Sequence, residues 1–540
     1  MKKIVECVPN FSEGQNKDTI EAIANAIKNV EGVSLLDVDP GFSTNRTVYT
    51  FVGTPESIVE GALAGARVAK KLIDMRKHKG EHPRMGALDV CPFIPISNVT
   101  MEECVEISKK FAEKVAKELS IPIYLYEFAS NNPNRKSLSQ IREGEYEGFA
   151  KKIYLPEWKP DYGPQEFIPE WGATVTGARN YLIAYNINVL GTSNQAHRIA
   201  LNLREAGRGE NEPGRLKEVK AIGWYVKEYG MAQISMNLTN YKVTPIHVAF
   251  EEAKKDASEL KIGLAGSEIV GLVPLEAILM AAEFYIEKEQ LFILEEEQKI
   301  KLAIDRLGLN SISQFIPEKR IIEYMLKDEV DGPLQSMTVK EFVNEVASRS
   351  SAPGGGSVSA LVAALGVGLG AMVAQLTYGV RKFEHLDTEM RKIIPPLYNL
   401  TKKLIPMIDE DTKAFNDYME ALKLPKNTDE EKSVRNEAMQ NGLKKAVEVP
   451  LNTMRLANSA WEWMFEVAKY GNIASKSDIE VGVKSLETGI WGAYKNVLIN
   501  LKSIKDSNYS DQIIEEVNKI IQNTQNYSKQ ILEFLDNRVN

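Results

Sequence analysis

A histidine pair in a segment that also contains glycine and proline is the first feature whose chemistry stands out. Residues 78–86 read HKGEHPRMG and contain the H-x-x-E-H letters of an inverted zinc-protease signature. That signature needs both histidines on one face of a continuous helix, and Gly80 and Pro83 interrupt a helix here. Without a metal, we expect His82 to lie in a turn. A histidine there suits proton transfer, since imidazole in general exchanges protons near neutral pH, but an ordinary surface turn gives the same pattern.

A run of carboxylates in the C-terminal half is the second feature. Asp409, Glu410 and Asp411 are consecutive and precede Thr412. Clustered acids raise one another's pKa when a bundle buries them, which favours acid–base chemistry. A solvated acidic helix face gives the same pattern. The periodicity therefore leaves both interpretations open.

A glycine-rich turn precedes an apolar helical segment. Residues 350–357 read SSAPGGGS, and backbone N–H groups at the start of a helix can bind an anion. Gly366, Gly368 and Gly370 follow and resemble a dinucleotide-binding fingerprint only weakly, because no strand precedes them. We expect these three glycines to allow close helix packing.

Two further segments combine polar or aromatic residues with turn formers. Residues 10–14 (NFSEG) follow the first expected strand, where polar groups often face a ligand, although Ser12 could equally cap a helix. Residues 161–174 contain Tyr162, Phe167 and Trp171. These rings either stack on a planar heterocycle or pin the loop from inside.

The N-terminal half alternates strand and helix signals. Strands are expected over residues 4–8, 33–38, 47–52, 87–96 and 121–126, and helices over residues 17–30, 55–75 and 101–119. The first six elements follow the β-α-β-β-α-β order of a ferredoxin-like unit. A similar order returns with strands over residues 179–190, 219–225, 233–238 and 269–273 and helices over residues 194–205, 245–260, 275–287 and 297–307. Residues 131–172 are expected to form a long functional loop. A groove between the two α/β halves of residues 1–326 is a natural ligand site.

The remainder reads as helix. A polar segment broken by Gly-Pro near residues 327–334 is a linker. Helical patterns follow near residues 338–349, 356–380, 386–422, 428–466, 474–503 and 509–536, with a cap at Asn427 and Thr428. The run from Val358 to Val380 is long enough to span a bilayer. Its many alanines and glycines favour a helix buried in a bundle.

Composition sets the class. The chain has 540 residues, 44% hydrophobic and 26% charged, with a net charge of −8, which fits a soluble protein of several domains and excludes general disorder. This negative net charge does not favour general binding to nucleic acid or to a membrane surface. Three cysteines at unrelated spacing argue against a zinc ribbon or a disulfide framework and suit the cytoplasm. We expect no signal peptide, because the apolar run before Glu6 is too short.

Six segments together resemble the formimidoyltransferase-cyclodeaminase family over essentially the whole length. They are VECVPNFSEG at residues 5–14, STNRTVYTFVG at 43–53, GEHPRMGALDV at 80–90, QAHRIALN at 195–202, APGGGS at 352–357 and NVLINL at 496–501. The resemblance implies an α+β fold, in which two ferredoxin-like α/β subdomains precede an all-α helical bundle. The implied domains are an N-subdomain at 1–181, a C-subdomain at 182–326, a linker at 327–334 and a cyclodeaminase domain at 335–540.

The resemblance also implies two consecutive reactions of histidine degradation. The formimino group moves from N-formimidoyl-L-glutamate to N5 of tetrahydrofolate and glutamate leaves. The product then cyclises to 5,10-methenyltetrahydrofolate and ammonia leaves. His82 matches the catalytic histidine of the first reaction, since N5 must lose a proton while the departing nitrogen gains one. Asp411 matches the acid of the second, where the amine must be protonated to leave.

The resemblance implies binding residues as well. Two segments match folate-binding segments of the family. They comprise Gly163, Pro164, Gln165, Glu166, Phe167, Ile168, Pro169, Glu170, Trp171 and Gly172, and Gly214, Arg215, Leu216, Lys217, Glu218, Val219, Lys220, Ala221, Ile222 and Gly223. Further candidates for substrate binding are Arg46, Arg84, Arg179, Gly355 and Asp409. The arginines suit the carboxylates of glutamate and folate.

Alternatives remain for the helical domain. One alternative is that it acts as a methenyltetrahydrofolate cyclohydrolase, since it also resembles those enzymes. The other is that it only drives assembly. The resemblance implies polyglutamylated tetrahydrofolate as co-substrate, no required metal and a cytoplasmic homo-octamer. We expect no nucleic-acid partner and no membrane span.

Overall fold

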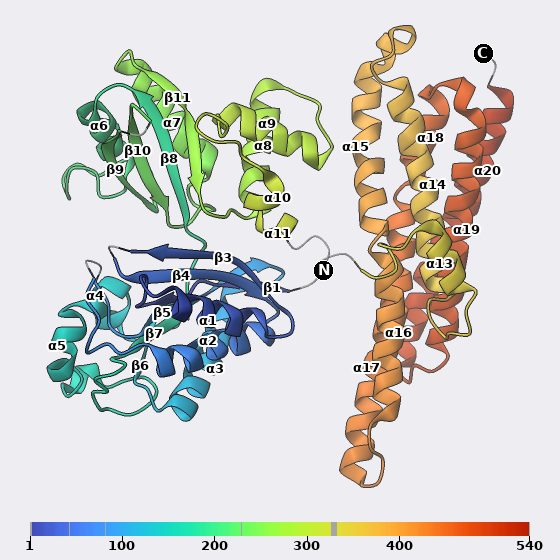
Figure 1. Cartoon of the computed structure of the whole chain (residues 1–540). Coiled ribbons are helices and arrows are strands. Elements are labelled where there is room, and N and C mark those ends of the chain that lie inside the picture. Colours follow the sequence, from blue (N-terminus) through green and yellow to red (C-terminus); the bar gives the residue numbers. More distant parts are fainter. Residues whose placement is uncertain (1–2, 43, 81–82, 228, 326–331, 539–540) are drawn as a thin grey trace. The chain divides into compact units, whose positions relative to one another are not determined.

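The computed structural model describes residues 3–42, 44–80, 83–227, 229–325 and 332–538. The chain forms two compact units, Met1–Val330 and Asp331–Asn540 (Figure 1). The N-terminal unit contains both sheets, and the C-terminal unit is helical.

The first sheet is built around a ferredoxin-like core. Its elements in chain order are β1 (Ile4–Cys7), α1 (Lys17–Lys28), β3 (Val33–Gly41), β4 (Arg46–Gly53), α2 (Ser57–Leu72) and β5 (Leu88–Ser97). The four strands lie side by side in the order β5-β1-β4-β3, and every neighbouring pair is antiparallel. A two-residue strand, β2 (Asn10–Phe11), pairs with β4 and β5 just beyond the end of β1.

Two parallel strands extend this sheet on the β5 side. The chain passes through α3 (Met101–Leu119) into β6 (Ile123–Glu127) and later returns as β7 (Thr174–Ala178), which lies between β5 and β6. Apolar side chains of α1, α2 and α3 pack on one face of the sheet, around residues such as Phe51 and Phe93. Because side chains alternate along a strand, their neighbours Val48, Val90 and Pro92 point to the opposite face.

The second lobe repeats the ferredoxin-like order. Its elements are β8 (Ile183–Leu190), α6 (Ser193–Leu203), β9 (Val219–Val226), β10 (Met231–Leu238), α7 (Ile246–Glu259) and β11 (Gly263–Val270). The strands lie in the order β11-β8-β10-β9, all antiparallel. The lobe continues through α8 (Leu275–Glu289), α9 (Glu296–Leu307), α10 (Pro317–Arg320) and α11 (Ile322–Met325). Ile4, Val52 and Ile94 of the first sheet share a buried core with this lobe, which joins the two lobes into one unit.

The C-terminal unit is a bundle of long helices. They are α13 (Val339–Val346), α14 (Gly355–Thr377), α15 (Asp387–Leu404), α16 (Met407–Lys423), α17 (Asp429–Asn458), α18 (Trp461–Tyr470), α19 (Lys476–Leu501) and α20 (Ser507–Asn537). Thr428 caps α17, as expected, and its hydroxyl accepts from the Glu431 N–H at 3.1 Å. The α+β fold with two ferredoxin-like subdomains and a helical bundle is therefore confirmed.

The apolar run that could have crossed a membrane is the inner helix of this bundle. In the described part of the chain, α14 alone is long and apolar enough to span a bilayer, and 61% of its most apolar window is buried. It packs against α15, α16 and α19. A Cβ at Gly366 would lie 2.6 Å from the Leu486 backbone nitrogen, so this glycine lets α14 approach α19 closely, as expected.

Several expected elements differ in extent. Residues 131–172 are not a continuous loop, since they contain α4 (Leu138–Arg142) and α5 (Glu145–Lys152). The single helix expected over residues 386–422 divides between α15 and α16 near Pro406, which lacks the N–H that would continue the helix. The helix expected over residues 428–466 divides between α17 and α18.

Candidate active sites

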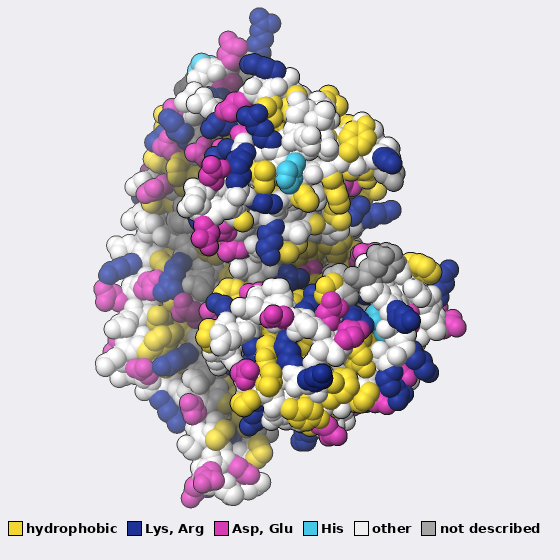
Figure 2. Space-filling model, turned by 90° about the vertical axis from the view of Figure 1, so that its left-hand side faces the viewer, with side chains coloured by type: hydrophobic (Ala, Val, Ile, Leu, Met, Phe, Trp, Pro, Cys, Tyr) yellow, Lys and Arg dark blue, Asp and Glu magenta, His cyan; other side chains and the backbone are white. Residues whose placement is uncertain are grey.

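A cavity of about 710 Å³ lies in the N-terminal unit, between its two lobes. Its walls come from the sheet face that α1, α2 and α3 leave uncovered, from the segment around α4, and from the ends of β9 and β10. The lining residues are Val8, Asn10, Arg46, Val48, Val90, Pro92, Tyr126, Glu127, Phe128, Lys136, Leu138, Arg142, Arg179, Asn180, Leu182, Glu218, Lys220 and Thr239. The space-filling view shows the surface of this unit hollowed between its lobes (Figure 2).

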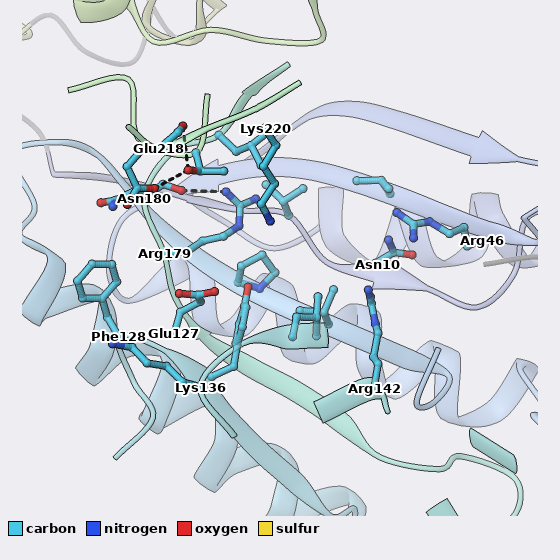
Figure 3. Close-up of a pocket in the computed structure, with 18 residues that line it drawn as sticks. Asn10, Arg46, Glu127, Phe128, Lys136, Arg142, Arg179, Asn180, Glu218 and Lys220 are labelled. Atoms are coloured by element: carbon cyan, nitrogen blue, oxygen red, sulfur yellow. Dashed lines mark hydrogen bonds between the residues drawn. The ribbon is translucent and has the colours of Figure 1, made fainter. Parts of the chain in front are cut away.

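Cationic side chains gather at both ends of this cavity (Figure 3). Arg46 and Arg142 lie near Asn10 at one end, and Arg179, Lys136 and Lys220 lie at the other. Burial lowers the pKa of Arg46, and the nearby positive charge of Arg142 lowers it further. Glu127 and Glu218 accompany the cations at the second end. Cations at both ends, with apolar residues between them, suit a ligand that carries carboxylates and a flat apolar body.

Two of the three arginines proposed for carboxylates line this cavity. They are Arg46 and Arg179. Arg84 has a different environment, since its Nη1 donates to Glu145 at 3.0 Å and to Glu147 at 2.9 Å. Its guanidinium is thus neutralised by α5, and a role in substrate binding stays a prediction.

The histidine that the family resemblance predicts to be catalytic is His82, and the structure describes the residues on either side of it. His82 and Glu81 themselves lie outside the described residues. Both ring nitrogens of His78 are occupied, because Nε2 lies 2.7 Å from the Asn45 carbonyl oxygen and Arg84 Nε donates to Nδ1 at 3.3 Å. This arrangement leaves His78 no free nitrogen for zinc and argues against the inverted zinc-protease interpretation.

The loop that contains Phe167 and Trp171 is held in place by contacts of these two side chains within the protein. Trp171 is fully buried, and its indole Nε1 donates to Thr174 Oγ1 at 3.0 Å. Phe167 packs against Tyr146 and Phe149. A planar ligand cannot stack on Trp171 in this arrangement, and residues 163–172 do not line the cavity in the described part of the chain. Folate binding by this segment stays a prediction.

The second segment predicted to bind folate, residues 214–223, contributes two side chains to the cavity. Glu218 and Lys220, at the start of β9, line it. Arg215 in the same segment instead donates to Glu252 and Asp256, each at 2.7 Å. Gly223 packs so closely on α6 that a Cβ there would lie 2.0 Å from the His197 nitrogen. Some residues of this segment therefore line the cavity, while others stabilise the fold.

In the NFSEG segment at residues 10–14, the ligand-facing prediction and the helix-cap prediction have different outcomes. Asn10 lines the cavity, as expected for a polar residue at a strand end. Ser12 does not cap a helix, because its hydroxyl donates to the Gly86 carbonyl oxygen at 2.7 Å and α1 is capped by Asn16.

In the helical unit, Asp411 lies against the first turn of α14. Ser357 Oγ donates to Asp411 Oδ2 at 3.3 Å and lies 3.1 Å from Thr412 Oγ1. A Cβ at Gly356 would lie 2.1 Å from Asp411 Oδ1, so only glycine permits this approach. Burial raises the pKa of Asp411, while the hydroxyl and the N–H of Ser357 lower it by less. The result is a carboxyl group suited to exchange a proton.

Two other predicted residues border this cluster in different ways. Asp409 accepts from the Leu334 N–H at 2.8 Å and the Gln335 N–H at 3.1 Å, so its carboxylate fixes the segment before α13. A Cβ at Gly355 would lie 3.4 Å from Asn496 Nδ2 of α19. The sequence did not predict that Asn496, Arg142 or Lys136 lies at a site, because neither periodicity nor spacing distinguishes these residues from other polar surface residues.

Comparison with known proteins covers every domain of the chain. The formiminotransferase domain, N-terminal subdomain, matches residues 4–179, the formiminotransferase domain matches 184–327, and the formiminotransferase-cyclodeaminase family matches 338–519. A formimidoyltransferase-cyclodeaminase of Dictyostelium discoideum is 59% identical over 540 residues, which is 100% of both chains. The chain belongs to the formimidoyltransferase-cyclodeaminase family.

Shorter relatives of the family match parts of the chain. A glutamate formimidoyltransferase of Streptococcus pyogenes is 45% identical over 54% of this chain and 95% of its own length. A methenyltetrahydrofolate cyclohydrolase of Methylorubrum extorquens is 32% identical over 38% of this chain and 98% of its own length. Within the described ranges, no group of three or more His, Cys, Asp or Glu side chains is placed to hold a metal ion.

Proposed function

We propose that this bifunctional folate enzyme of histidine degradation divides its two reactions between its two units. The N-terminal unit transfers the formimino group from N-formimidoyl-L-glutamate to N5 of tetrahydrofolate and releases glutamate. The helical unit converts 5-formimidoyltetrahydrofolate into 5,10-methenyltetrahydrofolate and ammonia. The observation that carries this proposal is the full-length similarity to formimidoyltransferase-cyclodeaminases.

The cavity between the two lobes suits the transfer step. N5 of tetrahydrofolate attacks the amidine carbon, loses its proton and displaces the glutamate nitrogen, which gains one. The imidazole of His82 accepts the first proton and supplies the second. Arg46 and Arg179 are proposed to hold carboxylates of the substrates, since both line the cavity.

The cluster around Asp411 suits the cyclisation. N10 attacks the formimino carbon, and the proton that N10 loses must reach the nitrogen that leaves as ammonia. A carboxyl group whose pKa is raised by burial can pass that proton from one nitrogen to the other. The N–H groups of the first turn of α14, Gly355 among them, are proposed to face a substrate carboxylate.

The remaining properties follow the family. We propose subdomains at residues 1–181 and 182–326, a linker at 327–334 and a cyclodeaminase domain at 335–540. Tetrahydrofolate is the co-substrate in its polyglutamylated form, and neither reaction requires a metal. The enzyme is proposed to act in the cytoplasm as a homo-octamer, in which a tethered polyglutamate tail raises the local concentration of the intermediate.

A cyclohydrolase activity of the helical unit is the second candidate. The similarity to the methenyltetrahydrofolate cyclohydrolase of Methylorubrum extorquens favours it. The two candidates differ in whether ammonia is released from a formimino substrate.

One assay separates these possibilities. Full-length protein is mixed with tetrahydrofolate and N-formimidoyl-L-glutamate, and glutamate, ammonia and the absorbance of methenyltetrahydrofolate are followed together. We expect His82→Ala to abolish all three signals, and Asp411→Ala to release glutamate while 5-formimidoyltetrahydrofolate accumulates. Wild-type protein that releases glutamate but neither ammonia nor methenyltetrahydrofolate would rule out the cyclodeaminase and leave the helical unit as a cyclohydrolase or a scaffold.

A further inference from the structure

The Arg46–Arg142 end of the cavity brings two cationic side chains together beside one carboxylate. Arg46 begins β4, and Arg142 ends α4. Figure 3 shows both guanidinium groups directed toward Asn10. Arg142 Nη2 donates to Asp89 Oδ2, and the second oxygen of Asp89 accepts from the Met85 N–H at 2.7 Å.

The local electrostatics favour an added anion. Asp89 is 2% exposed and forms an ion pair with Arg142, so it offsets one of the two positive charges directly. Asp39 adds a weaker attraction for Arg46. Arg142 Nε is buried and has no hydrogen-bond partner among the described residues. Two positive charges held close together are costly, and a carboxylate between the two guanidinium groups would relieve that cost.

The position of this pair indicates which carboxylate it holds. Asn45, which precedes Arg46, donates through Nδ2 to the Lys79 carbonyl oxygen at 2.8 Å, and its own carbonyl oxygen lies 2.7 Å from His78 Nε2. A Cβ at Gly80 would lie 2.3 Å from the Thr44 carbonyl oxygen. Arg46 is therefore adjacent to the chain segment that leads into His82.

The two substrates differ in how far their carboxylates lie from the reacting atoms. In N-formimidoyl-L-glutamate the α-carboxylate is two bonds from the nitrogen that leaves. In tetrahydrofolate a p-aminobenzoyl group separates the reacting ring from the glutamate. A carboxylate-binding pair next to the catalytic segment thus suits the donor, and the cations at the other end, Lys136, Arg179 and Lys220, suit the folate tail.

We propose that Arg46 and Arg142 together bind a carboxylate of the formimino donor and that Arg142 is a specificity-determining residue of the transferase. This inference rests on the proposed function of the N-terminal unit. Asp89 holds the planar guanidinium of Arg142 in place through Nη2, so the direction of this fork is fixed. A lysine there would keep the charge beside Asp89 but lose the planar fork of the guanidinium.

Steady-state kinetics of Arg142→Lys in the full-length enzyme test this inference. We expect the KM for N-formimidoyl-L-glutamate to rise about tenfold or more, with the KM for tetrahydrofolate unchanged. Donor analogues with one carboxylate converted into a carboxamide sharpen the test. The loss in kcat/KM on amidation of the bound carboxylate should be smaller in the variant than in wild type.

The matched control is Lys220→Gln, at the opposite end of the same cavity. We expect it to raise the KM for tetrahydrofolate and to leave the KM for the donor unchanged. An unchanged KM for tetrahydrofolate in Arg142→Lys also shows that the N-terminal unit is folded. An unchanged donor KM in Arg142→Lys, or a rise confined to tetrahydrofolate, would overturn the inference. Wild-type protein that transfers no formimino group would instead overturn the proposed function.

Discussion

Burial raises the pKa of Glu6 in the N-terminal unit and of Asp411 in the helical unit, but the surroundings of these two carboxyl groups differ. Burial raises the pKa of Glu6 to about 8, and the charge of Arg179 opposes that rise. Glu6 is only 2% exposed and lies on β1 in the interior of the N-terminal unit. Asp411 lies on α16 against a backbone kept free of side-chain bulk by Gly356, and the Ser357 hydroxyl donates to it.

This difference shows that a raised pKa reports burial and does not by itself mark a catalytic acid. Glu6 is closed off from solvent, so exchange of its proton affects folding stability more directly than chemistry. Asp411 combines a shifted pKa with nearby hydrogen-bond donors and a glycine turn. The N-terminal unit, by contrast, has cations spread along a cavity.

Adding a methyl group beside Asp411 is the strongest test of this contrast. Gly356→Ala would place a Cβ 2.1 Å from Asp411 Oδ1, so the carboxyl group must move. Because displacement of a catalytic group by about 1 Å costs about a hundredfold in rate, we expect cyclisation to fall about a hundredfold. Glutamate release by the N-terminal unit should be unchanged. Initial rates of ammonia and glutamate release measure both effects.

Gly354→Ala is the matched control in the same turn. A Cβ at Gly354 has its nearest neighbour, the Ser351 carbonyl oxygen, at 3.9 Å. Its cyclisation rate should stay within about threefold of wild type, because ordinary van der Waals contact needs no rearrangement. Equal losses in both variants would mean that the glycines serve the turn itself and not the approach of Asp411.

The sequence allowed much of the fold to be predicted, because helix and strand periodicities are local. The ferredoxin-like order of both lobes depends on long amphipathic elements such as α3, and these were expected within a few residues of their ends. The missed elements are short or depend on distant partners. β2 has two residues, α4 has five, and β7 is defined by its parallel neighbours β5 and β6.

The site was less predictable, because residue type does not determine which partner a side chain finds. Arg46 and Arg84 looked equivalent in the sequence, yet Arg46 lines the cavity and Arg84 pairs with Glu145 and Glu147, more than sixty residues away. Arg142 was missed because its helix is too short to show a pattern. Asp411 came from the family resemblance, and its contact with Ser357 depends on how α14 packs against α16.

A smaller effect is expected for Glu6, whose burial influences the stability of the fold and not a reaction. The folded-state pKa of Glu6, about 8, lies above its unfolded value of 4.5. Its contribution to stability is therefore complete below the unfolded pKa and is lost as the pH rises toward the folded one. Glu6→Gln removes this dependence. Relative to wild type, the variant should gain about 2 kcal/mol of unfolding free energy between about pH 5 and about pH 7.

Thermal or denaturant unfolding of the full chain at both pH values measures this difference. Glu21→Gln, at an exposed position of α1, is the control and should show no pH-dependent gain. If Glu6→Gln and wild type lose stability in parallel as the pH rises, Glu6 is not a buried neutral acid and the contrast with Asp411 disappears.

The smallest effect concerns the hydroxyl beside Asp411. Ser357 Oγ donates to the Asp411 carboxylate and so opposes the rise that burial causes in the pKa of Asp411. Ser357→Ala removes that opposition, so the pKa should rise further and the pH at which cyclisation loses its proton donor should move upward. We expect the rate at the optimum to fall only about threefold to tenfold, since one neutral hydrogen bond contributes about 1 kcal/mol. The pH–rate profile of cyclisation with supplied 5-formimidoyltetrahydrofolate measures both changes.

Thr412→Val separates this electrostatic role from packing. Thr412 Oγ1 lies 3.1 Å from Ser357 Oγ, so we expect its hydroxyl to influence Asp411 through that of Ser357. Its profile should therefore shift less than that of Ser357→Ala, in the same direction. A Ser357→Ala profile that keeps the wild-type midpoint, or moves to lower pH, would show that the hydroxyl does not stabilise the charged carboxylate. Burial and the backbone N–H of Ser357 would then set the proton affinity of Asp411 without it.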